Sequence, residues 1–288
     1  MEAIDIFDRR WPALLKELPD ISPPKTLFLR GTLPPPDSLS IAIVGTRNPT
    51  SYGKDVTRDI VHALAPHHIV VVSGLALGID GVAHRAALDE KLPTIAVLGS
   101  GIDDASIYPR EHLELAHRII QERGALISEY EEGSKAARWT FPRRNRIIAG
   151  VAHATIVVEA NEKSGARITA RLASEYSRDV YAVPGSIYQA RSRGTNALIK
   201  EGATPIVSME QLIEDLGLIA PHQDLPTQFS IEFSEIETTI LRTLDEPRTL
   251  DELIRIVQRD AREVMSAVTK LEIRGIIKEI GGGTYRTS

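Results

Sequence analysis

Short apolar runs, separated by amphipathic stretches, form the pattern of the middle of the chain. Segments 41–44, 69–72 and 94–98 are nearly continuous apolar runs, and each precedes a glycine-containing turn and a stretch with apolar residues at helical spacing. Apolar runs of this length are typical of strands buried on both faces of a parallel sheet. Strands that alternate with helices predict an α/β domain whose mostly parallel sheet is covered on both faces.

The alternation also predicts where the elements lie. Strands are expected at 41–44, 69–72, 94–98, 125–128, 154–158, 180–183 and 205–207, and helices at 52–64, 80–89, 111–122 and 168–177, with one more before residue 205. The alternation stops near residue 216. We therefore predict an α/β domain over residues 41–217.

Three further parts flank this domain. Residues 1–40 are expected to form an N-terminal arm, with one helix that docks on the domain and a stiff proline spacer at 34–36. Residues 218–230 contain two prolines among polar residues and are predicted to be a linker. Residues 231–288 show three amphipathic stretches followed by two short strands around a glycine turn, which predicts a winged-helix domain.

Composition limits the kind of protein this can be. The chain has 288 residues, a formal net charge of −5 and no cysteine, which excludes disulfides and thiolate metal sites. Met1–Arg10 lacks the apolar core of a signal peptide, and no apolar run approaches membrane-spanning length, so we expect a cytoplasmic protein without membrane contact. Because the total charge is slightly negative, any binding of nucleic acid must depend on a local site.

One such local site is predicted where four arginines gather. Arg138 to Arg146 carries four positive charges and no negative one, and Phe141 and Asn145 lie among them. Guanidinium groups bind phosphate bidentately, and a neighbouring aromatic ring can stack on a base. The simpler alternative is a solvated surface turn that leads into a helix.

Glycine-rich loops follow three of the predicted strands. They are Gly45–Arg47, Ser73–Asp80 and Gly99–Gly101, and the second has the small residues of a phosphate cradle before a helix. Ser164 and Gly165 similarly open a later helix, where a helix cap is the alternative. None of these loops is a Walker loop or a dinucleotide fingerprint. Open α/β sheets bind ligands beyond the carboxyl ends of their strands, so together these loops predict a crevice for phosphates.

Catalytic signals are weak by comparison. Asp80 and His84 share a helix face but have no third ligand at metal-site spacing, so His84 is predicted to be structural. Ser73 and Ser100 have no histidine–carboxylate partner apparent in the sequence. We therefore expect no enzymatic activity, no metal and no cofactor.

Several motifs together resemble the DNA-processing protein A (DprA/Smf) family. The resemblance covers about residues 11–216, and it rests on the following segments: Ile43–Arg47, Ser73–Asp80, Phe141–Gly150, Val157–Ala160 with Ser164–Gly165, Val183–Gly185, and Gly194–Asn196. The segment Phe141–Gly150 is the most specific of these. The resemblance implies an extended Rossmann-like domain that binds single-stranded DNA and dimerises. It also implies a recombination mediator that protects incoming strands and loads the RecA recombinase during natural transformation.

The resemblance also implies which residues contact DNA. The motif match transfers this role to Arg47, Phe141, Arg143, Asn145 and Arg146. The full expected set is Arg47, Ser73, Gly74, Arg138, Phe141, Arg143, Arg144, Asn145, Arg146, Ser164 and Gly165. Arg138 lies where many members have lysine, so the charge is kept while the geometry of the donors differs.

Two alternatives remain open from the sequence. A Rossmann-like hydrolase of nucleoside monophosphates shares the glycine-rich sheet edge, although Pro184–Ser186 lacks the second glycine of its loop. A DNA-reading role for the winged-helix domain is disfavoured, because residues 230–288 hold nine Lys/Arg and eleven Asp/Glu, a net charge of −2. For that domain we expect protein contact or weak auxiliary DNA contact.

Overall fold

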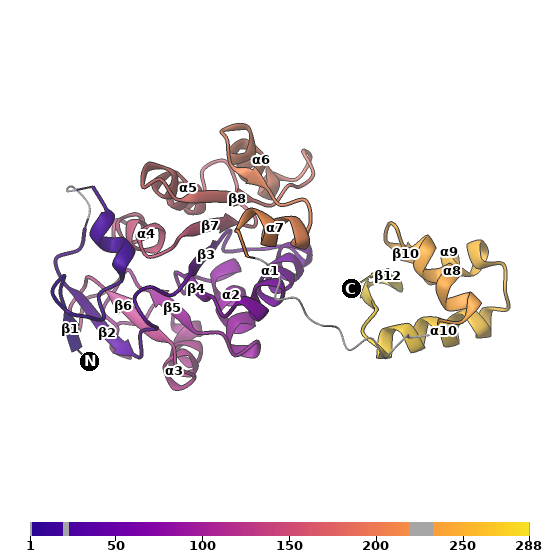
Figure 1. Ribbon diagram of the computed structural model, residues 1–288, viewed down its shortest axis with the longest axis horizontal. Helices are drawn as coiled ribbons and strands as arrows, with labels where there is room; N and C mark the ends of the chain where they lie inside the picture. The colour runs from indigo at the N-terminus through magenta and orange to yellow at the C-terminus, as the bar shows by residue number, and fades with distance from the viewer. Residues whose placement is uncertain (1, 20–22, 219–232, 288) are drawn as a thin grey trace. The chain divides into compact units, whose positions relative to one another are not determined.

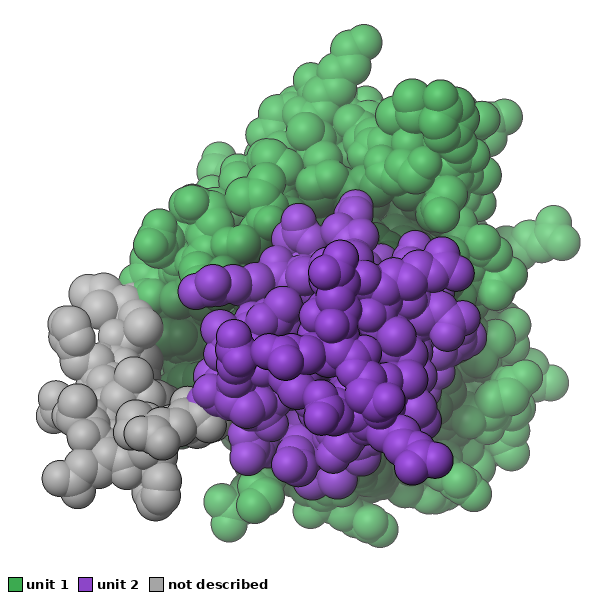
Figure 2. Space-filling model, turned by 90° about the vertical axis from the view of Figure 1, so that its right-hand side faces the viewer, with its two compact units in different colours: residues 1–222 green, residues 223–288 purple. Residues whose placement is uncertain are grey.

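The chain forms two compact units, residues 1–222 and residues 223–288. The structure is a computed structural model that describes residues 2–19, 23–218 and 233–287 (Figure 1). Figure 2 colours the two units separately. Apart from Leu218, the predicted linker lies outside the described residues.

The larger unit contains a nine-stranded, mostly parallel sheet in the order β1-β2-β6-β5-β4-β3-β7-β8-β9. The seven strands from β6 to β9 in this order pair in parallel, and β1 and β2 add antiparallel to one edge. The strands are β1 Glu2–Ile4, β2 Leu27–Gly31, β3 Ser40–Val44, β4 Val70–Ser73, β5 Thr94–Val97, β6 Ala125–Ser128, β7 Ala154–Val157, β8 Asp179–Ala182 and β9 Thr204–Pro205. The predicted α/β class is confirmed.

Helices cover both faces of this sheet (Figure 1). One face packs against α1 Ser51–Leu64, α2 Ile79–Asp89, α3 Leu113–Gln121 and α7 Met209–Asp215. The other packs against α4 Thr140–Gly150, α5 Gly165–Glu175 and α6 Ala190–Lys200. Short 3-10 turns lie at η1 Ala13–Glu17, η2 Ala65–His67 and η3 Arg110–His112. Because both faces are covered, nearly every residue of the central strands is buried, which explains their continuous apolar runs.

The N-terminal region, expected to be an arm with one docking helix, also adds two strands to the sheet of the larger unit. β1 and β2 extend the sheet beyond β6, and Trp11, Leu15 and Leu18 are buried in the core under η1. The helical spacing of these residues therefore belongs to a 3-10 turn and its flanks. Without β2, strand β6 would expose an unpaired edge, so its pairing partner comes from a segment about a hundred residues earlier.

Three of the four clustered arginines lie on helix α4 and Arg138 precedes it, whereas the simpler alternative was a surface turn that leads into a helix. Pro142 lies in the first turn, where a missing amide donor costs no helical hydrogen bond. Arg191 and Arg193 lie in α6. In both helices successive residues point in directions about 100° apart, so neighbouring arginines face different surroundings.

The chain reverses its direction of strand addition at β3. Strands β4, β5 and β6 are added on one side of β3, and β7, β8 and β9 are added on the other. The loop after β3 and the loop after β7 therefore diverge at the carboxyl edge of the sheet. Such a switch point leaves a crevice where α/β proteins bind their ligands.

The smaller unit has the winged-helix arrangement that its sequence predicted. Its elements are α8 Glu235–Thr243, β10 Arg248–Thr249, α9 Leu250–Val257, α10 Ala261–Ile273, β11 Ile277–Gly281 and β12 Thr284–Thr287. The three helices and β11 bury a core that includes Ile240, Leu253, Val264 and Leu271. Capping boxes begin both α8 and α9, which explains why these short helices start where they do. In the described part of the whole chain, no helix is long and apolar enough to span a membrane.

Candidate nucleic-acid interface

A cavity of about 610 Å³ opens at the switch point. Its walls come from the loops after β3 and β7, from the start of α5 and from one side of α4. Seven of the expected site residues line it, namely Arg47, Arg138, Phe141, Arg144, Asn145, Ser164 and Gly165. Segments that are more than a hundred residues apart in the chain thus meet in one cavity.

Arg47 and Phe141 form the centre of this cavity. The Arg47 guanidinium carbon lies 5.1 Å from the centroid of the Phe141 ring, a cation–π contact. Tyr108 packs at a tilt on the same ring, with the centroids 5.7 Å apart. Arg47 is exposed and has no carboxylate partner among the described residues, so its charge remains available to an anion.

The backbone around Arg47 is fixed by its neighbours. The Thr46 amide donates to the Glu159 carbonyl at 2.7 Å, and the Thr46 carbonyl accepts from the Ile79 amide at 3.2 Å. Gly78 has a φ of +83°, and a side chain there would overlap the Thr46 carbonyl oxygen. This close approach of two loops requires glycine at position 78 and holds Arg47 at the mouth of the cavity.

The N-terminus of α5 supplies further positive potential. The Ser164 hydroxyl accepts from the Ala166 amide at 3.2 Å and so caps the helix, while Gly165 faces open space. Lys163 and Arg138 line the same cavity, and both are exposed without a carboxylate partner in the described ranges. The helix dipole adds to these charges, so this wall of the cavity favours an anion.

Arg144 is part of the protein interior, although it was expected at the DNA. It is 4% exposed, and its guanidinium donates to the carbonyl oxygens of Gly74, at 2.6 Å, and Val97. Burial lowers the pKa of Arg144 to about 10, while the nearby Asp80 carboxylate opposes that shift. Its N–H groups donate to carbonyl oxygens at the ends of β4 and β5, so Arg144 links α4 to the sheet.

Ser73 and Gly74 also serve the interior. The Ser73 hydroxyl is fully buried and donates to the Ile43 carbonyl at 2.6 Å. The Gly74 amide donates to Asp80 Oδ2 at 3.1 Å, and the Ala76 amide donates to the same oxygen at 3.4 Å. The amides that looked like a phosphate cradle thus already bind a carboxylate of the protein itself. Burial raises the pKa of Asp80, and the Arg144 charge opposes this rise.

Asn145 is a positioning residue rather than an exposed donor. It is 8% exposed, its amide group donates to the Gly165 carbonyl at 3.2 Å, and its Oδ1 accepts from Arg144 Nε at 3.2 Å. It therefore ties α4 to the start of α5, the two elements that carry Phe141 and Ser164. Its specific place in the sequence motif follows from this bridging contact.

Arg143 and Arg146 face away from the cavity. Both pair with Glu129: Arg143 Nε lies 3.7 Å from Glu129 Oε2, and Arg146 makes a closer ion pair with Oε1. They line a separate cavity of about 690 Å³ together with Glu129, Tyr130 and Lys25. The four arginines of the cluster thus have three kinds of surroundings.

The sequence missed two residues of the main cavity. Tyr108 packs on Phe141, and Lys163 stands at the start of α5. Lys163 could have been found from its position just before a predicted helix N-terminus, next to Ser164. Nothing near Tyr108 in the sequence signals its contact, because its partner lies thirty-three residues later in the chain.

The titratable groups behind the cavity have structural roles. His84 is fully buried and its Nδ1 lies 2.8 Å from the Thr94 hydroxyl, as its prediction as a structural residue requires. Burial lowers the pKa of His84 to about 3, with smaller contributions from His112 and Arg144. Glu159, also buried, accepts from the Thr50 amide at 2.9 Å and from the Thr50 hydroxyl at 2.5 Å, and so fixes the start of α1. Over the described residues, no group of His, Cys, Asp or Glu could hold a metal ion.

Comparison with known proteins assigns each of the two units to a known domain family. Residues 2–217 match the family model of DNA recombination-mediator protein A, and residues 231–283 match the DprA winged helix domain. Protein Smf of Synechocystis is 36% identical over 97% of this chain and 78% of its own length. The DNA processing protein DprA of Bacillus subtilis is 42% identical over 75% of this chain and 71% of its own length.

Solved structures agree with this placement. DNA processing protein A from Streptococcus pneumoniae superposes with a TM-score of 0.68 at 37% identity and covers 74% of each chain. The Helicobacter pylori protein, solved to describe its single-stranded DNA binding mode, gives a TM-score of 0.65 at 32% identity over 75% of this chain and 96% of its own. The chain therefore belongs to the DNA recombination-mediator protein A family, also called DprA or Smf.

Proposed function

We propose that this protein binds single-stranded DNA in the cavity at the switch point and acts as a recombination mediator. The observation that carries the proposal is the arrangement of Arg47 over the Phe141 ring, in a cavity whose other cations are Arg138 and Lys163. Cations that track a phosphate backbone beside an aromatic platform for bases are the two components of single-strand binding sites.

The geometry favours single strands over duplex. Phe141 is half-buried on the cavity wall, and Tyr108, which lines the same cavity, packs at a tilt on its ring. A base reaches such a ring when it is unstacked, and unstacking a base from a duplex costs a few kcal/mol. The Helicobacter pylori relative, whose structure was determined for its single-stranded DNA binding mode, supports the same choice of ligand.

The proposed site residues are Arg47, Arg138, Phe141, Ser164 and Gly165 in direct contact, with Lys163 added from the structure. Asn145 and Arg144 position the site indirectly, because Asn145 links α4 to α5 and Arg144 links α4 to the sheet. Ser73 and Gly74 bind Ile43 and Asp80 within the protein, and they have no direct role in DNA binding in this proposal. The buried carboxylate of Glu159, beside the carboxyl edge of the sheet, already accepts two hydrogen bonds from Thr50. This favours DNA binding over nucleotide hydrolysis.

The mediator role rests on family membership. We propose that the protein, as a homodimer, protects incoming single strands and loads RecA on them during natural transformation or recombination. A strand held by its backbone and by one or two stacked bases is shielded yet can be released, which suits transfer to a second protein. Sedimentation of the protein alone tests the dimer, and RecA filament formation on coated strands, with and without the protein, tests the loading.

Fluorescence anisotropy with labelled oligo-dT, measured over a salt series, tests the binding site. Arg47→Ala and Arg138→Ala are each expected to weaken binding and to lower the log–log salt slope by about 0.7, the value for one lost single-strand phosphate contact. Arg171→Ala is the matched control, because this arginine is exposed on α5 outside the cavity and pairs with Glu175. Unchanged binding in both cavity variants would rule out this site.

A further inference from the structure

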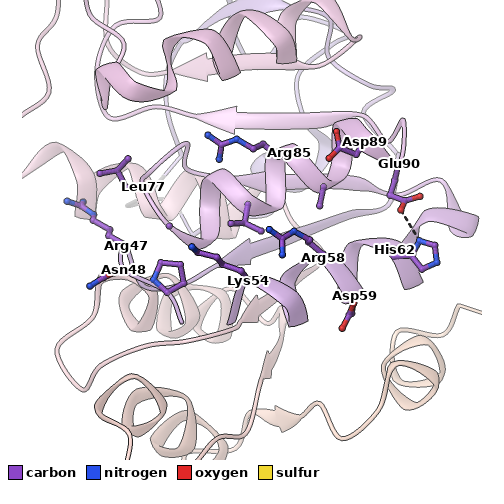
Figure 3. A pocket seen from close by; sticks show the side chains of 14 residues that line it. Arg47, Asn48, Lys54, Arg58, Asp59, His62, Leu77, Arg85, Asp89 and Glu90 are labelled. Atoms are coloured by element: carbon purple, nitrogen blue, oxygen red, sulfur yellow. Dashed lines mark hydrogen bonds and ion pairs between the residues drawn. The ribbon is translucent and has the colours of Figure 1, made fainter. Parts of the chain in front are cut away.

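A second cavity, of about 820 Å³, adjoins the first and shares Arg47 with it (Figure 3). It lies between α1 and α2, which pack against each other. We call it the α1–α2 groove. Its cationic residues are Arg47, Lys54, Arg58 and Arg85. Because Arg47 belongs to both cavities, a chain-like ligand that passes Arg47 enters the groove directly.

Four cations line the groove together with three carboxylates, Asp59, Asp89 and Glu90, of which Asp89 pairs with Arg118 and Glu90 with His62. Lys54 and Arg85 have no carboxylate partner within the residues that the structure describes, and Arg85 donates to the carbonyl of Gly81 on its own helix. Arg58 pairs with Asp55 at 2.8 Å, in an exposed pair of the kind that contributes little stability. Lys54 and Arg58 are four residues apart on α1 and therefore lie about 6 Å apart along one side of that helix.

The charge of the groove also differs between its two ends. Figure 3 shows Arg47 and Asn48 at one end and the His62–Glu90 pair at the other, with Lys54, Arg58 and Arg85 between them. Asp89 and Glu90 come together at the far end, on the last turn of α2 and just beyond it. A polyanion is therefore attracted at the Arg47 end and repelled at the far end. This limits the groove to a short stretch of nucleic-acid backbone.

From this geometry we infer that the α1–α2 groove is a phosphate track for the same single strand that occupies the first cavity. The inference rests on the proposed function and extends it. The strand leaves the Phe141 platform, passes Arg47 and places its phosphates against Lys54 and Arg85. Pro49 and the 40% exposed Leu77 offer apolar surface but no aromatic platform, so contact here is made through the backbone and is independent of sequence.

Two lengths of oligo-dT separate the track from the first cavity. The double variant Lys54→Ala/Arg85→Ala is expected to bind a strand of about 20 nucleotides roughly tenfold more weakly, with a salt slope lower by about 1.4, for two lost contacts. A strand of about 5 nucleotides, near the smallest single-strand site sizes, fills the first cavity and should bind the double variant and the wild type alike. Arg171→Ala again serves as the matched control.

The possible results distinguish the two proposals. If the wild type binds both strands and the double variant binds the long one with unchanged affinity and slope, the track is refuted and the first cavity stands. If the wild type binds neither strand, the proposed function fails, and the track fails with it. A loss on both lengths also refutes the track, since it places Lys54 and Arg85 at the first cavity. Lys54→Gln/Arg85→Gln, which keeps longer aliphatic stems, replaces the alanine variant if a thermal melt shows it unfolded.

Discussion

The two sides of α4 place similar residues in opposite settings. On the cavity side, Phe141 is half-buried beneath an exposed Arg47, and the neighbouring Arg144 turns inward to the strand ends. On the other side, Arg143 and Arg146 meet the carboxylate of Glu129. The first side combines uncompensated charge with an aromatic ring, whereas the second neutralises its charge within the protein.

This difference shows that arginine density by itself does not define a nucleic-acid site. Desolvation and existing partners decide whether a guanidinium is available, since a buried charge is retained when it is well hydrogen-bonded and is costly when it is not. Arg144 is buried and well hydrogen-bonded, and Arg146 forms an ion pair with Glu129. Arg47 and Arg138, which have no carboxylate partner among the described residues, remain able to bind an anion. The predictions below test this division, beginning with the largest expected effect.

Arg144→Ala should have the largest effect, and the effect should be on stability. It leaves the Gly74 and Val97 carbonyls and the Asp80 carboxylate without their buried partner, and such losses cost about 3–5 kcal/mol. Urea unfolding followed by tryptophan fluorescence measures this in the larger unit, because Trp11 and Trp139 both lie there. A variant as stable as the wild type that fails to bind oligo-dT would instead place Arg144 at the DNA.

Arg146→Ala should also reduce stability, by about 1–3 kcal/mol, the cost of leaving a buried polar group unsatisfied. Both side chains of its ion pair are nearly buried, with 13% exposure for Arg146 and 11% for Glu129. Replacing the pair by Arg146→Met with Glu129→Leu should restore part of the loss, because no buried charge is then left unpaired. The salt slope of oligo-dT binding should stay unchanged. A lower slope would show that Arg146 contacts phosphate.

Acid should destabilise the interior behind α4. Burial lowers the pKa of His84 to about 3 from 6.5, so below pH 6.5 the unfolded chain binds a proton that the folded protein excludes. Stability is therefore full above pH 6.5 and falls as the pH drops towards the folded pKa. For this one group the loss is about 2 kcal/mol near pH 5. Urea unfolding of His84→Gln should show a correspondingly flatter pH profile, and an equal slope in both proteins would contradict the assignment.

Phe141→Ala should weaken oligo-dT binding by about 1–3 kcal/mol, as expected for one lost base stack, with little change in salt slope. Phe141→Tyr keeps the ring and should keep most of the affinity. Thermal melts of both variants are the control, because the ring is half-buried and packs against Tyr108. If Phe141→Ala lowers the melting temperature and affinity together while Phe141→Tyr changes neither, the ring is structural rather than a base platform.

Arg143→Ala should have the smallest effect. Its side chain is 56% exposed and lies 3.7 Å from Glu129, a geometry that contributes within about 0.5 kcal/mol to stability. The sequence resemblance placed Arg143 at the DNA, whereas the carboxylate beside it should repel phosphate. A salt series therefore decides the matter: an unchanged slope confines the interface to the cavity side, and a slope lower by about 0.7 extends it across α4.

The comparison also separates what the sequence determined from what the tertiary structure decided. Apolar periodicity located the seven parallel strands to within one or two residues, and it located the three helices and hairpin of the winged unit, because burial and helix caps are encoded locally. The motif Phe141–Gly150 identified the family, and the loops after β3 and β7 indicated the correct edge of the sheet.

Non-local contacts decided the rest. β2 pairs with the edge of β6 and β1 pairs with β2, and the role of Arg144 depends on carbonyls 70 and 47 residues away in the chain. The Gly74 amide was predicted to be open to phosphate, but Asp80 occupies it once α2 packs in place. A sequence thus shows which residues carry charge, whereas solvation and existing partners, which tertiary packing sets, determine which charges remain free to bind DNA.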